Sequence, residues 1–470
     1  MGEGVSPKKI VIIGGGPGGY VAAIRAAQLG ARPLLIEKDR IGGICLNRGC
    51  IPTKALLHDV KLLRSLKKYP AFQSQSIENV NLLWSMMDRK KKVVEELVKG
   101  VEILLESYRV TVKNARADLL SSNQIILFNG EDQKEIIEAD AIILAPGSMF
   151  KTLPHITPDG EKIITSDEAL EIKKIPREIV IVGGGYIGVE FATLFHALGS
   201  KVTIVEMLES LLPGVEAELV RNLRRFLERD GITIFTQSSV EEIQHGENEL
   251  RLTVKTPKGI EELSAEKLLV AVGRIPRLDI DFSKAGVITS PQGIQVNAKM
   301  QTTTSNIYAI GDAIGGALLA HVAMEEAIVA AENAMGADRK METPLIPLCI
   351  FTYPEIASIG LTEKEAKDKG EVKIGRFPFR SNPKAVISGE TDGLIKVVAS
   401  RENDTVLGIH IIGSDASTLL SIASTMVGEK LKNFTRFIQA HPTLSEALKE
   451  ACLDVNGMAI HLPKPLRRHQ

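Results

Sequence analysis

The sequence has little cysteine, few aromatic residues and no excess of either charge. Cysteine accounts for 4 of the 470 residues, and aromatic side chains make up 4%. Secreted proteins that depend on disulfides carry far more cysteine, so we expect a cytoplasmic protein. With 57 basic and 58 acidic residues the net charge is -1, which argues against a nucleic-acid partner or an anionic membrane surface.

Long hydrophobic runs are also absent. No stretch of the sequence reaches the roughly 18 apolar residues that a membrane-spanning helix needs. A predicted strand already begins at Lys9 or Ile10, so we expect no signal or transit peptide. A chain of this length is expected to form roughly two to four domains, each with its own core.

What the sequence does contain is a close cysteine pair, Cys45 and Cys50, within GGICLNRGCIPTK (residues 42–54). Such a pair can alternate between dithiol and disulfide, which makes it a candidate two-electron redox centre. A zinc or iron-sulfur site would need further ligands nearby, whereas Cys349 and Cys452 are distant in sequence. We predict these two to be buried, small apolar residues. A structural disulfide is the alternative interpretation of the pair, and the low cysteine content disfavours it.

Residues 10–37 have the pattern of a βαβ dinucleotide-binding unit. An apolar run, IVII, leads through the turn GGGPGG into a predicted helix and a second strand. Gly14, Gly16 and Gly19 hold the positions where a side chain would block the turn, the pyrophosphate or the helix packing. Glu37 ends the second strand, where a carboxylate accepts from a ribose hydroxyl. A glycine-rich turn without a ligand is the alternative, and the complete unit argues against it.

The same unit recurs at residues 179–206, as IVIV, GGGYIG, a predicted helix and KVTIVE. Gly183, Gly185 and Gly188 hold the same three positions. The carboxylate of Glu206 would repel a 2'-phosphate, so NAD is favoured over NADP. A degenerate structural copy of the first unit is the alternative interpretation.

The remaining segments predict a third domain of different construction. An amphipathic helix is expected over 83–107, short strands near 110–112 and 125–128, and apolar strands over 268–272 and 306–310. Beyond residue 343, strands at 374–378, 393–400 and 406–412 precede helices near 416–429 and 444–456. The predicted fold is therefore α/β with two Rossmann-like domains, followed by an α+β domain.

Several motifs, in this order, resemble those of the flavin-dependent pyridine nucleotide-disulfide oxidoreductases. They are CLNRGCIPTK (45–54), IGD (310–312), FTYPE (351–355) and HPTLSE (441–446). The resemblance covers essentially the whole chain. It implies an FAD-binding domain at 1–150, an NAD-binding domain at 151–271, a central segment at 272–343 completing the FAD side, and a C-terminal domain at 344–470 that forms a homodimer.

The resemblance implies different roles for the two cysteines. Cys50 would face the flavin as a thiolate, and Cys45 would exchange with substrate. A helix beginning near Cys50 would stabilise a thiolate at its N-terminus. Lys54, one turn later, would approach the flavin with Glu190 as its counter-charge. A solvated helix lysine is the alternative for Lys54.

His441 is the candidate acid-base catalyst, because thiol-disulfide exchange needs proton transfer near neutral pH, where imidazole titrates. Glu446 could hold its ring, as a carboxylate does in catalytic triads. The resemblance implies that this pair acts on the other subunit's disulfide, and it assigns His321 to the flavin side. Without the resemblance, a structural histidine would be the simpler interpretation.

The resemblance also implies the remaining cofactor contacts. Gly147 and Asp312 would contact FAD, and Gly273 and Arg274 would contact NAD. Tyr186 would cover the flavin until nicotinamide displaces it, with plain packing as the alternative. No metal site is expected.

The implied activity is oxidation of protein-bound dihydrolipoamide with reduction of NAD+. The implied partners are a lipoyl-bearing protein and the acyltransferase core of a 2-oxo-acid dehydrogenase or glycine cleavage complex. Reduction of another disulfide is the main alternative, and a docking subunit of such a complex is another. Glutathione or trypanothione reduction would favour NADP, which Glu206 opposes. Coenzyme A disulfide reduction would ordinarily use one cysteine. Mercuric reduction expects a terminal cysteine pair, which RRHQ (467–470) lacks.

Two residues depart from the family pattern. Arg48 lies between the cysteines, where relatives usually have an apolar residue, and a cation there could favour a thiolate or an anionic substrate. Pro146 replaces a residue that is usually threonine, which removes a hydroxyl beside the flavin.

Overall fold

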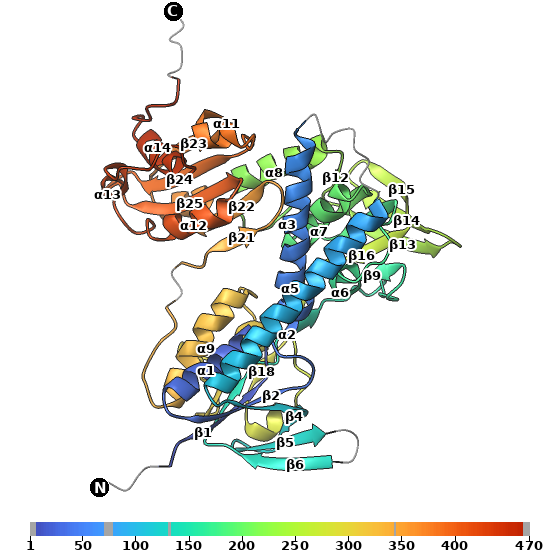
Figure 1. Ribbon diagram of the computed structural model, residues 1–470, viewed down its shortest axis with the longest axis vertical. Helices are drawn as coiled ribbons and strands as arrows, with labels where there is room; N and C mark the ends of the chain where they lie inside the picture. The colour runs from blue at the N-terminus through green and yellow to red at the C-terminus, as the bar shows by residue number, and fades with distance from the viewer. Residues whose placement is uncertain (1–5, 70–78, 130–132, 343–344, 464–470) are drawn as a thin grey trace, which may run out of the picture.

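Over residues 6–69, 79–129, 133–342 and 345–463, the computed structural model contains three five-stranded sheets (Figure 1). Two of them are parallel and the third is antiparallel. The terminal RRHQ considered above lies outside the described residues. The predicted fold class is confirmed by this arrangement of two parallel sheets and an α+β part.

The first sheet has the strand order β20-β7-β1-β2-β3 and is parallel throughout. Its strands are β1 (Lys9–Ile13), β2 (Arg32–Glu37), β3 (Thr111–Asn114), β7 (Ala141–Leu144) and β20 (Ile307–Ala309). Ile10 and Ile12 pack with α1 (Pro17–Gln28) and α9 (Ala320–Ala334). Val11 and Ile13 pack against a small antiparallel sheet on the other face. Both faces of β1 are therefore covered, which explains its unbroken apolar sequence.

That small sheet consists of β4 (Arg116–Leu119), β5 (Gln124–Asn129) and β6 (Gln133–Glu138). The sequence indicated only its middle strand. The strand predicted at 110–112 is β3 in the structure, which begins and ends later than expected. Its polar residues Lys113 and Asn114 still pair with β2, so the strand extends beyond the apolar residues.

The second sheet repeats the design of the first, with the order β12-β11-β10-β16-β9. Its strands are β9 (Ile163–Ile164), β10 (Glu178–Val182), β11 (Lys201–Val205), β12 (Thr233–Phe235) and β16 (Lys267–Val270). The helices α7 (Tyr186–Ala197) and α8 (Ala217–Arg229) cover one face. An antiparallel sheet that the sequence analysis did not predict covers the other: β13 (Ser239–His245), β14 (Leu250–Thr256) and β15 (Gly259–Ala265).

The third sheet is antiparallel, in the order β21-β22-β25-β24-β23. Its strands are β21 (Leu348–Ile350), β22 (Glu355–Gly360), β23 (Val372–Pro378), β24 (Leu394–Ser400) and β25 (Val406–Gly413). Two predicted helices are shorter than expected, α12 (Ala416–Ser424) and α14 (Glu446–Asp454). The prediction of helix up to residue 429 is wrong, because the chain turns after Ser424 and Gly428 has a φ of 93°, which a helix cannot contain.

Two long helices run between the part of the molecule built on the first sheet and the part built on the second sheet (Figure 1). They are α3 (Cys50–Lys67) and α5 (Asn79–Ser107). Leu56 of α3 and Met86 of α5 share a core with Phe191 and Phe195 of α7. The helix that begins at Cys50 is therefore packed against the helix that follows the second glycine turn.

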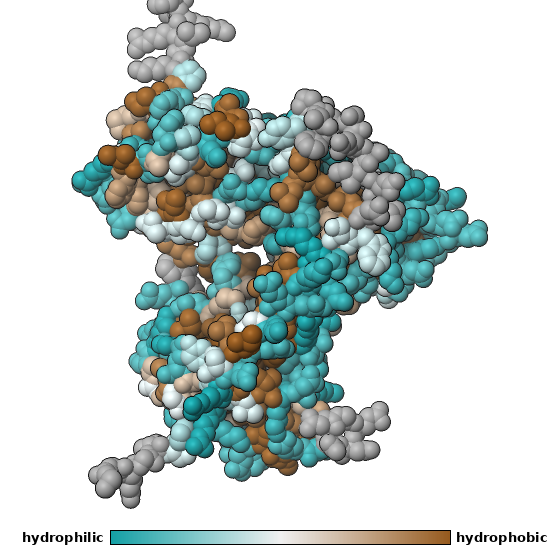
Figure 2. Space-filling model, in the orientation of Figure 1, coloured by the Kyte–Doolittle hydropathy of each residue, from teal (hydrophilic) through white to brown (hydrophobic). Residues whose placement is uncertain are grey.

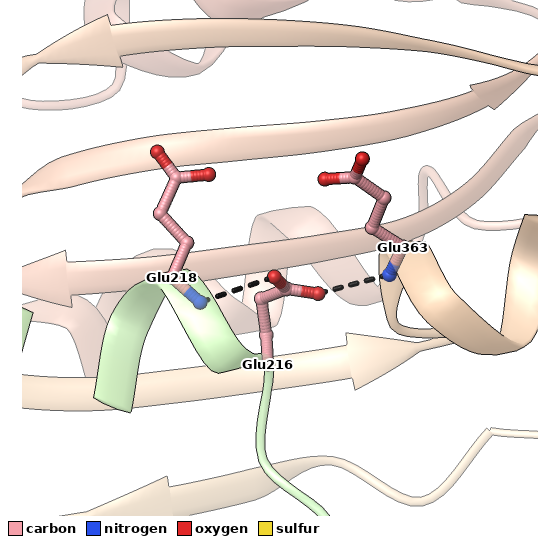
Figure 3. A group of neighbouring side chains, drawn as sticks. All are labelled: Glu216, Glu218 and Glu363. Carbon is pink, nitrogen blue, oxygen red and sulfur yellow. Dashed lines mark hydrogen bonds between the residues drawn. The ribbon is translucent and has the colours of Figure 1, made fainter. Parts of the chain in front are cut away.

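A buried ionic cluster joins α8 to the third sheet. Glu216 and Glu218 at the start of α8 face Glu363, the first residue of α10 (Glu363–Lys369), and Glu216 accepts the backbone N–H groups of the other two (Figure 3). Lys396 of β24 is 1% exposed, and its Nζ lies 2.7 Å from Glu216, 3.1 Å from Glu218 and 2.6 Å from Glu363. The lysine thus supplies the cation that the three carboxylates require.

Replacing Lys396 with methionine is expected to lower the free energy of unfolding by about 3 kcal/mol, the low end of the cost of breaking a buried ion pair. Arg376 and Lys367 still face two of the carboxylates, which limits the loss. Thermal and denaturant unfolding measure it. Lys201→Met is the control, because this strand lysine is 69% exposed and pairs only at the surface. Equal losses in both variants would contradict the prediction.

Large apolar side chains are exposed in the C-terminal part, whose visible face shows hydrophobic residues among hydrophilic ones (Figure 2). Ile438 is 97% exposed and Ile460 is 73% exposed. Phe437 and Met458 are exposed as well. Such a group of apolar residues is typical of an interaction surface. Within the described ranges, every helix is too short or too polar to cross a bilayer.

Candidate active site

A cavity of about 640 Å³ lies where the carboxyl ends of the first sheet meet α3 and α7. It brings together many of the predicted site residues: Gly14, Gly16, Gly19, Glu37, Cys45, Cys50, Lys54, Gly147, Tyr186, Glu190, Arg274, Asp312 and His321. Arg48 and Pro146 also line it. The residues Gly183, Gly185, Gly188, Glu206, Gly273, His441 and Glu446 do not line this cavity, and they are described below.

The first glycine turn has the shape that a dinucleotide requires. Gly14 has a φ of 107°, and a Cβ there would lie 2.0 Å from the carbonyl oxygen of Ala145. At Gly19 a Cβ would lie 1.7 Å from the carbonyl oxygen of Gly14. At Gly16, which lines the cavity, a Cβ would meet no atom within 4 Å and would enter the open space before α1. The residues therefore fit a pyrophosphate bound at a helix N-terminus.

The second glycine turn has nearly the same geometry. A Cβ at Gly183 would lie 2.4 Å from a carbonyl oxygen, and one at Gly188 would lie 1.9 Å from another, whereas Gly185 again has no neighbour within 4 Å. Gly273, which follows β16, has a φ of 102°. The second unit is thus a geometric copy of the first and fits a second dinucleotide.

The acidic residues at the two strand ends are held in the same way. Glu37 accepts the N–H of Gly15 at 2.6 Å and that of Asp39 at 2.8 Å. Glu206 accepts the N–H of Gly184 and, at 2.7 Å, that of Leu208. Each carboxylate oxygen retains a lone pair, so both groups can still accept from a ribose hydroxyl.

The two cysteines lie on two helices that meet at Gly49. Cys45 is on α2 (Gly43–Arg48), a short helix that the sequence analysis did not predict, and Cys50 is the first residue of α3. Both are free thiols, and each side chain shifts the pKa of the other. Interaction with the Cys45 side chain lowers the pKa of Cys50 to about 7; burial raises it, and the charge of Lys54 lowers it further. Interaction with the Cys50 side chain and burial raise the pKa of Cys45. Of the two thiols, Cys50 is therefore the one that ionises more readily.

Lys54 is fixed beside this pair by a buried carboxylate. Its Nζ lies 3.0 and 2.8 Å from the two oxygens of Glu190, whose side chain is 3% exposed. The backbone N–H of Phe351 also donates to Glu190 at 2.9 Å, and the Lys54 ammonium lies 5.0 Å from the centre of the Phe351 ring. The lysine is held inside the site, rather than solvated on the helix surface.

Arg48 makes its contacts away from the thiols. It pairs with Asp39, and its Nε lies 4.0 Å from Asp167. The cation that lowers the pKa of Cys50 is Lys54. The expectation that Arg48 favours the thiolate is therefore unsupported by its position, because its charge is shared between two carboxylates.

The thiolate fraction of Cys50 is expected to rise with pH through a midpoint near 7 and to be lost as pH falls below it. Alkylation rates of the reduced protein, followed for each cysteine by mass spectrometry, measure this midpoint. Lys54→Met should raise it, because the cation is lost, whereas Lys61→Met on the same helix should not. A midpoint near the ordinary thiol value of 9.0, or one unmoved by Lys54→Met, would contradict the assignment.

Sequence reasoning missed three groups in or beside this cavity. Ser148 is fully buried and bonds to both Arg274 and Asp312. Glu326 of α9 accepts the N–H of Gly311 at 2.7 Å, and burial raises its pKa to about 6. Cys349, expected to be buried packing, is only half-buried and lines the cavity, and its pKa is raised to about 11 by burial. Cys452 is buried as predicted.

A signal for two of these groups was present in the sequence. Ser148 is a polar residue that follows an apolar strand and a glycine, the same feature that singled out Arg274 and Asp312. Glu326 is a charged residue on the inner face of an alanine-rich helix, where a carboxylate has a cost unless it is bonded.

His441 lies away from the cavity of its own subunit. Its Nδ1 is 3.0 Å from Glu446, which also accepts the N–H of Thr443 at 2.9 Å. Burial raises the pKa of Glu446, but these two donors outweigh it and the pKa is below its usual range. The His441 side chain is 67% exposed. Within one subunit, the described residues do not bring this imidazole to the cysteines.

Comparison with known proteins covers nearly the whole chain. The family described as pyridine nucleotide-disulphide oxidoreductase matches residues 8–327, and its dimerisation domain matches residues 346–452. The chain is 43% identical over 463 residues to a dihydrolipoyl dehydrogenase of Bacillus subtilis, covering 96% of this chain and 99% of the relative. It is 37% identical to the mitochondrial dihydrolipoyl dehydrogenase of Pisum sativum, covering 98% and 94%.

Solved structures agree with this assignment. The HOCl-induced flavoprotein disulfide reductase RclA from Escherichia coli superimposes with a TM-score of 0.84 at 27% identity, covering 94% of this chain and 99% of that one. LpdA from Mycobacterium tuberculosis, at 24% identity, shares the fold with a TM-score of 0.87 over 95% and 99% of the two chains. The chain belongs to the pyridine nucleotide-disulphide oxidoreductase family, and it is a homodimeric oxidoreductase that uses FAD and NAD(H).

Proposed function

We propose that the protein oxidises protein-bound dihydrolipoamide to lipoamide through Cys45 and Cys50, with NAD+ as the final acceptor. The observation that carries this proposal is the inequivalent cysteine pair, which lies in one cavity with a dinucleotide turn and a lysine paired to the buried Glu190. Two relatives of closely similar length, named dihydrolipoyl dehydrogenase, support the substrate.

The pKa values of the two thiols indicate which sulfur the substrate attacks. One thiolate of the dihydrolipoyl group attacks Sγ of Cys45 in the oxidised pair; the Cys45–Cys50 bond breaks, a mixed disulfide forms and Cys50 leaves as thiolate. The second substrate thiol then attacks the substrate sulfur of the mixed disulfide, which releases lipoamide and Cys45. Cys50 is the better leaving group, since its pKa is the lower of the two.

His441 of the partner subunit is proposed to accept the proton from the substrate thiol, with Glu446 holding its ring at 3.0 Å. Exposed apolar residues around it, among them Phe437 and Ile438, are consistent with a subunit interface at this position. FAD, when bound, supplies two-electron transfer from the dithiol to NAD+. Gly14, Gly16, Gly19, Glu37, Gly147 and Asp312 would hold it.

The second unit is proposed to bind NAD rather than NADP. Glu206 is 7% exposed and fixed by two backbone N–H groups, and its carboxylate would repel a 2'-phosphate bound at this strand end. Tyr186, at the start of α7 and within the cavity, would cover the flavin, while Gly273 and Arg274 follow β16 at the nucleotide side. The domain limits given above (1–150, 151–271, 272–343 and 344–470) are proposed with this assignment.

A steady-state panel tests the proposal. The protein should oxidise dihydrolipoamide with NAD+ far faster than it oxidises NADPH with lipoamide, glutathione disulfide or coenzyme A disulfide. Faster reduction of glutathione disulfide or of coenzyme A disulfide, or a preference for NADPH, would overturn the proposal.

The larger assembly is proposed on the same basis. We expect the homodimer to act in the cytoplasm on the lipoyl groups of a 2-oxo-acid dehydrogenase or glycine cleavage complex. Pull-down with an acyltransferase core, compared with turnover of free dihydrolipoamide, separates docking from catalysis. Capture of the core without turnover would favour a docking subunit.

A further inference from the structure

Ser148 lies where the two halves of the catalytic unit are joined. It is the first residue of β8 (Ser148–Phe150), which follows β7 of the first sheet. β8 pairs antiparallel with β17 (Arg274–Pro276), which follows β16 of the second sheet. This short ribbon thus connects the carboxyl end of the flavin-side sheet with that of the nicotinamide-side sheet.

The Ser148 hydroxyl is bonded on both sides. Arg274 Nε donates to Ser148 Oγ at 2.8 Å, and its Nη2 donates to the Ser148 carbonyl oxygen at 3.2 Å. Because a guanidinium can only donate, the hydroxyl accepts from it and has its own proton free for Asp312 Oδ2. The direction of the relay, from Arg274 through Ser148 to Asp312, is therefore fixed.

We propose that Ser148 is a positioning residue that holds the nicotinamide-side Arg274 and the flavin-side Asp312 in one fixed arrangement. The inference rests on the proposed assignment of Asp312 to FAD and of Arg274 to NAD. Ser148 is fully buried, so water cannot replace its hydroxyl without a rearrangement.

Ser148→Ala tests the proposal in the intact holoenzyme. We expect FAD to be released about tenfold faster and the KM for NAD+ to rise about tenfold, the size of one lost hydrogen bond to a charged group. The KM for dihydrolipoamide should stay within about twofold, because the thiols are untouched. FAD release is followed by flavin fluorescence and needs no substrate.

Ser200→Ala is the matched control. Ser200 is 3% exposed and donates to the carbonyl oxygen of Pro176 at 2.6 Å, at the opposite end of the second sheet. The Ser200→Ala variant should have a lower free energy of unfolding, with FAD release and the KM for NAD+ unchanged. If Ser200→Ala changes both quantities as Ser148→Ala does, or if Ser148→Ala changes neither, the proposal is overturned.

A double-mutant cycle with Arg274→Gln then tests whether Ser148 acts through the arginine. The double variant should have the same KM for NAD+ as Arg274→Gln alone. Additive increases in KM would overturn the relay. Failure of the proposed function would instead appear in the wild-type substrate panel, while the FAD release rates of the serine variants remain interpretable.

Discussion

Cys45→Ser is expected to lower turnover of dihydrolipoamide with NAD+ by about 10⁴-fold or more, as for removal of a catalytic nucleophile elsewhere. A serine hydroxyl cannot form the mixed disulfide. Cys50 alone cannot form the protein disulfide that accepts two electrons from the substrate dithiol. The dinucleotide turns and the Lys54–Glu190 ion pair remain. Oxidation of NADH by an artificial dye needs FAD but no protein disulfide, so it should persist within about threefold.

The control for this variant is Cys349→Ser, since Cys349 lines the same cavity but has a thiol whose pKa is raised to about 11. It should keep both activities. FAD content is measured for each variant by absorbance. Near-normal dihydrolipoamide turnover in Cys45→Ser, or loss of dye reduction while FAD is retained, would refute this division of labour between the cysteines.

The two nucleotide units could be predicted from sequence because their constraints are local. At Gly14 and Gly19 a Cβ would lie within 2.0 Å of a backbone oxygen, so only glycine fits. The spacing of these glycines can therefore be recognised in the sequence. The buried strands before the turns must be apolar on both faces, since helices cover one face and a small sheet the other. Both requirements leave a pattern that a single sequence displays.

Features that depend on contacts between distant segments could not be predicted. In the small sheet of β13, β14 and β15, the two outer strands β13 and β15 are mostly exposed and alternate weakly, and only the middle strand β14 has a regular alternation of buried and exposed residues. The bonds of Ser148 need strands from two sheets, and those of Lys396 need α8 and α10. The pairing of Arg48 with Asp39 likewise depends on how α2 lies against the end of β2.

His441→Gln is expected to lower dihydrolipoamide turnover by about 10²- to 10⁴-fold, the usual contribution of a positioned acid-base group. The glutamine amide can still donate to Glu446, so the loss reports proton transfer rather than a collapsed loop. FAD content and dye reduction should be unchanged. The matched control is His461→Gln: His461 is 66% exposed and lies 3.1 Å from Glu450, yet it should keep full turnover.

A mixed dimer decides whether His441 serves the other subunit. One subunit carries Cys45→Ser and the other His441→Gln, and the heterodimer is purified through two different tags. In a two-fold dimer with shared sites, intact Cys45 of one subunit meets intact His441 of the partner subunit in one of the two sites, so about half of the wild-type turnover should return. If each histidine served its own cysteines, both sites would be defective and the mixed dimer would be as inactive as its parents.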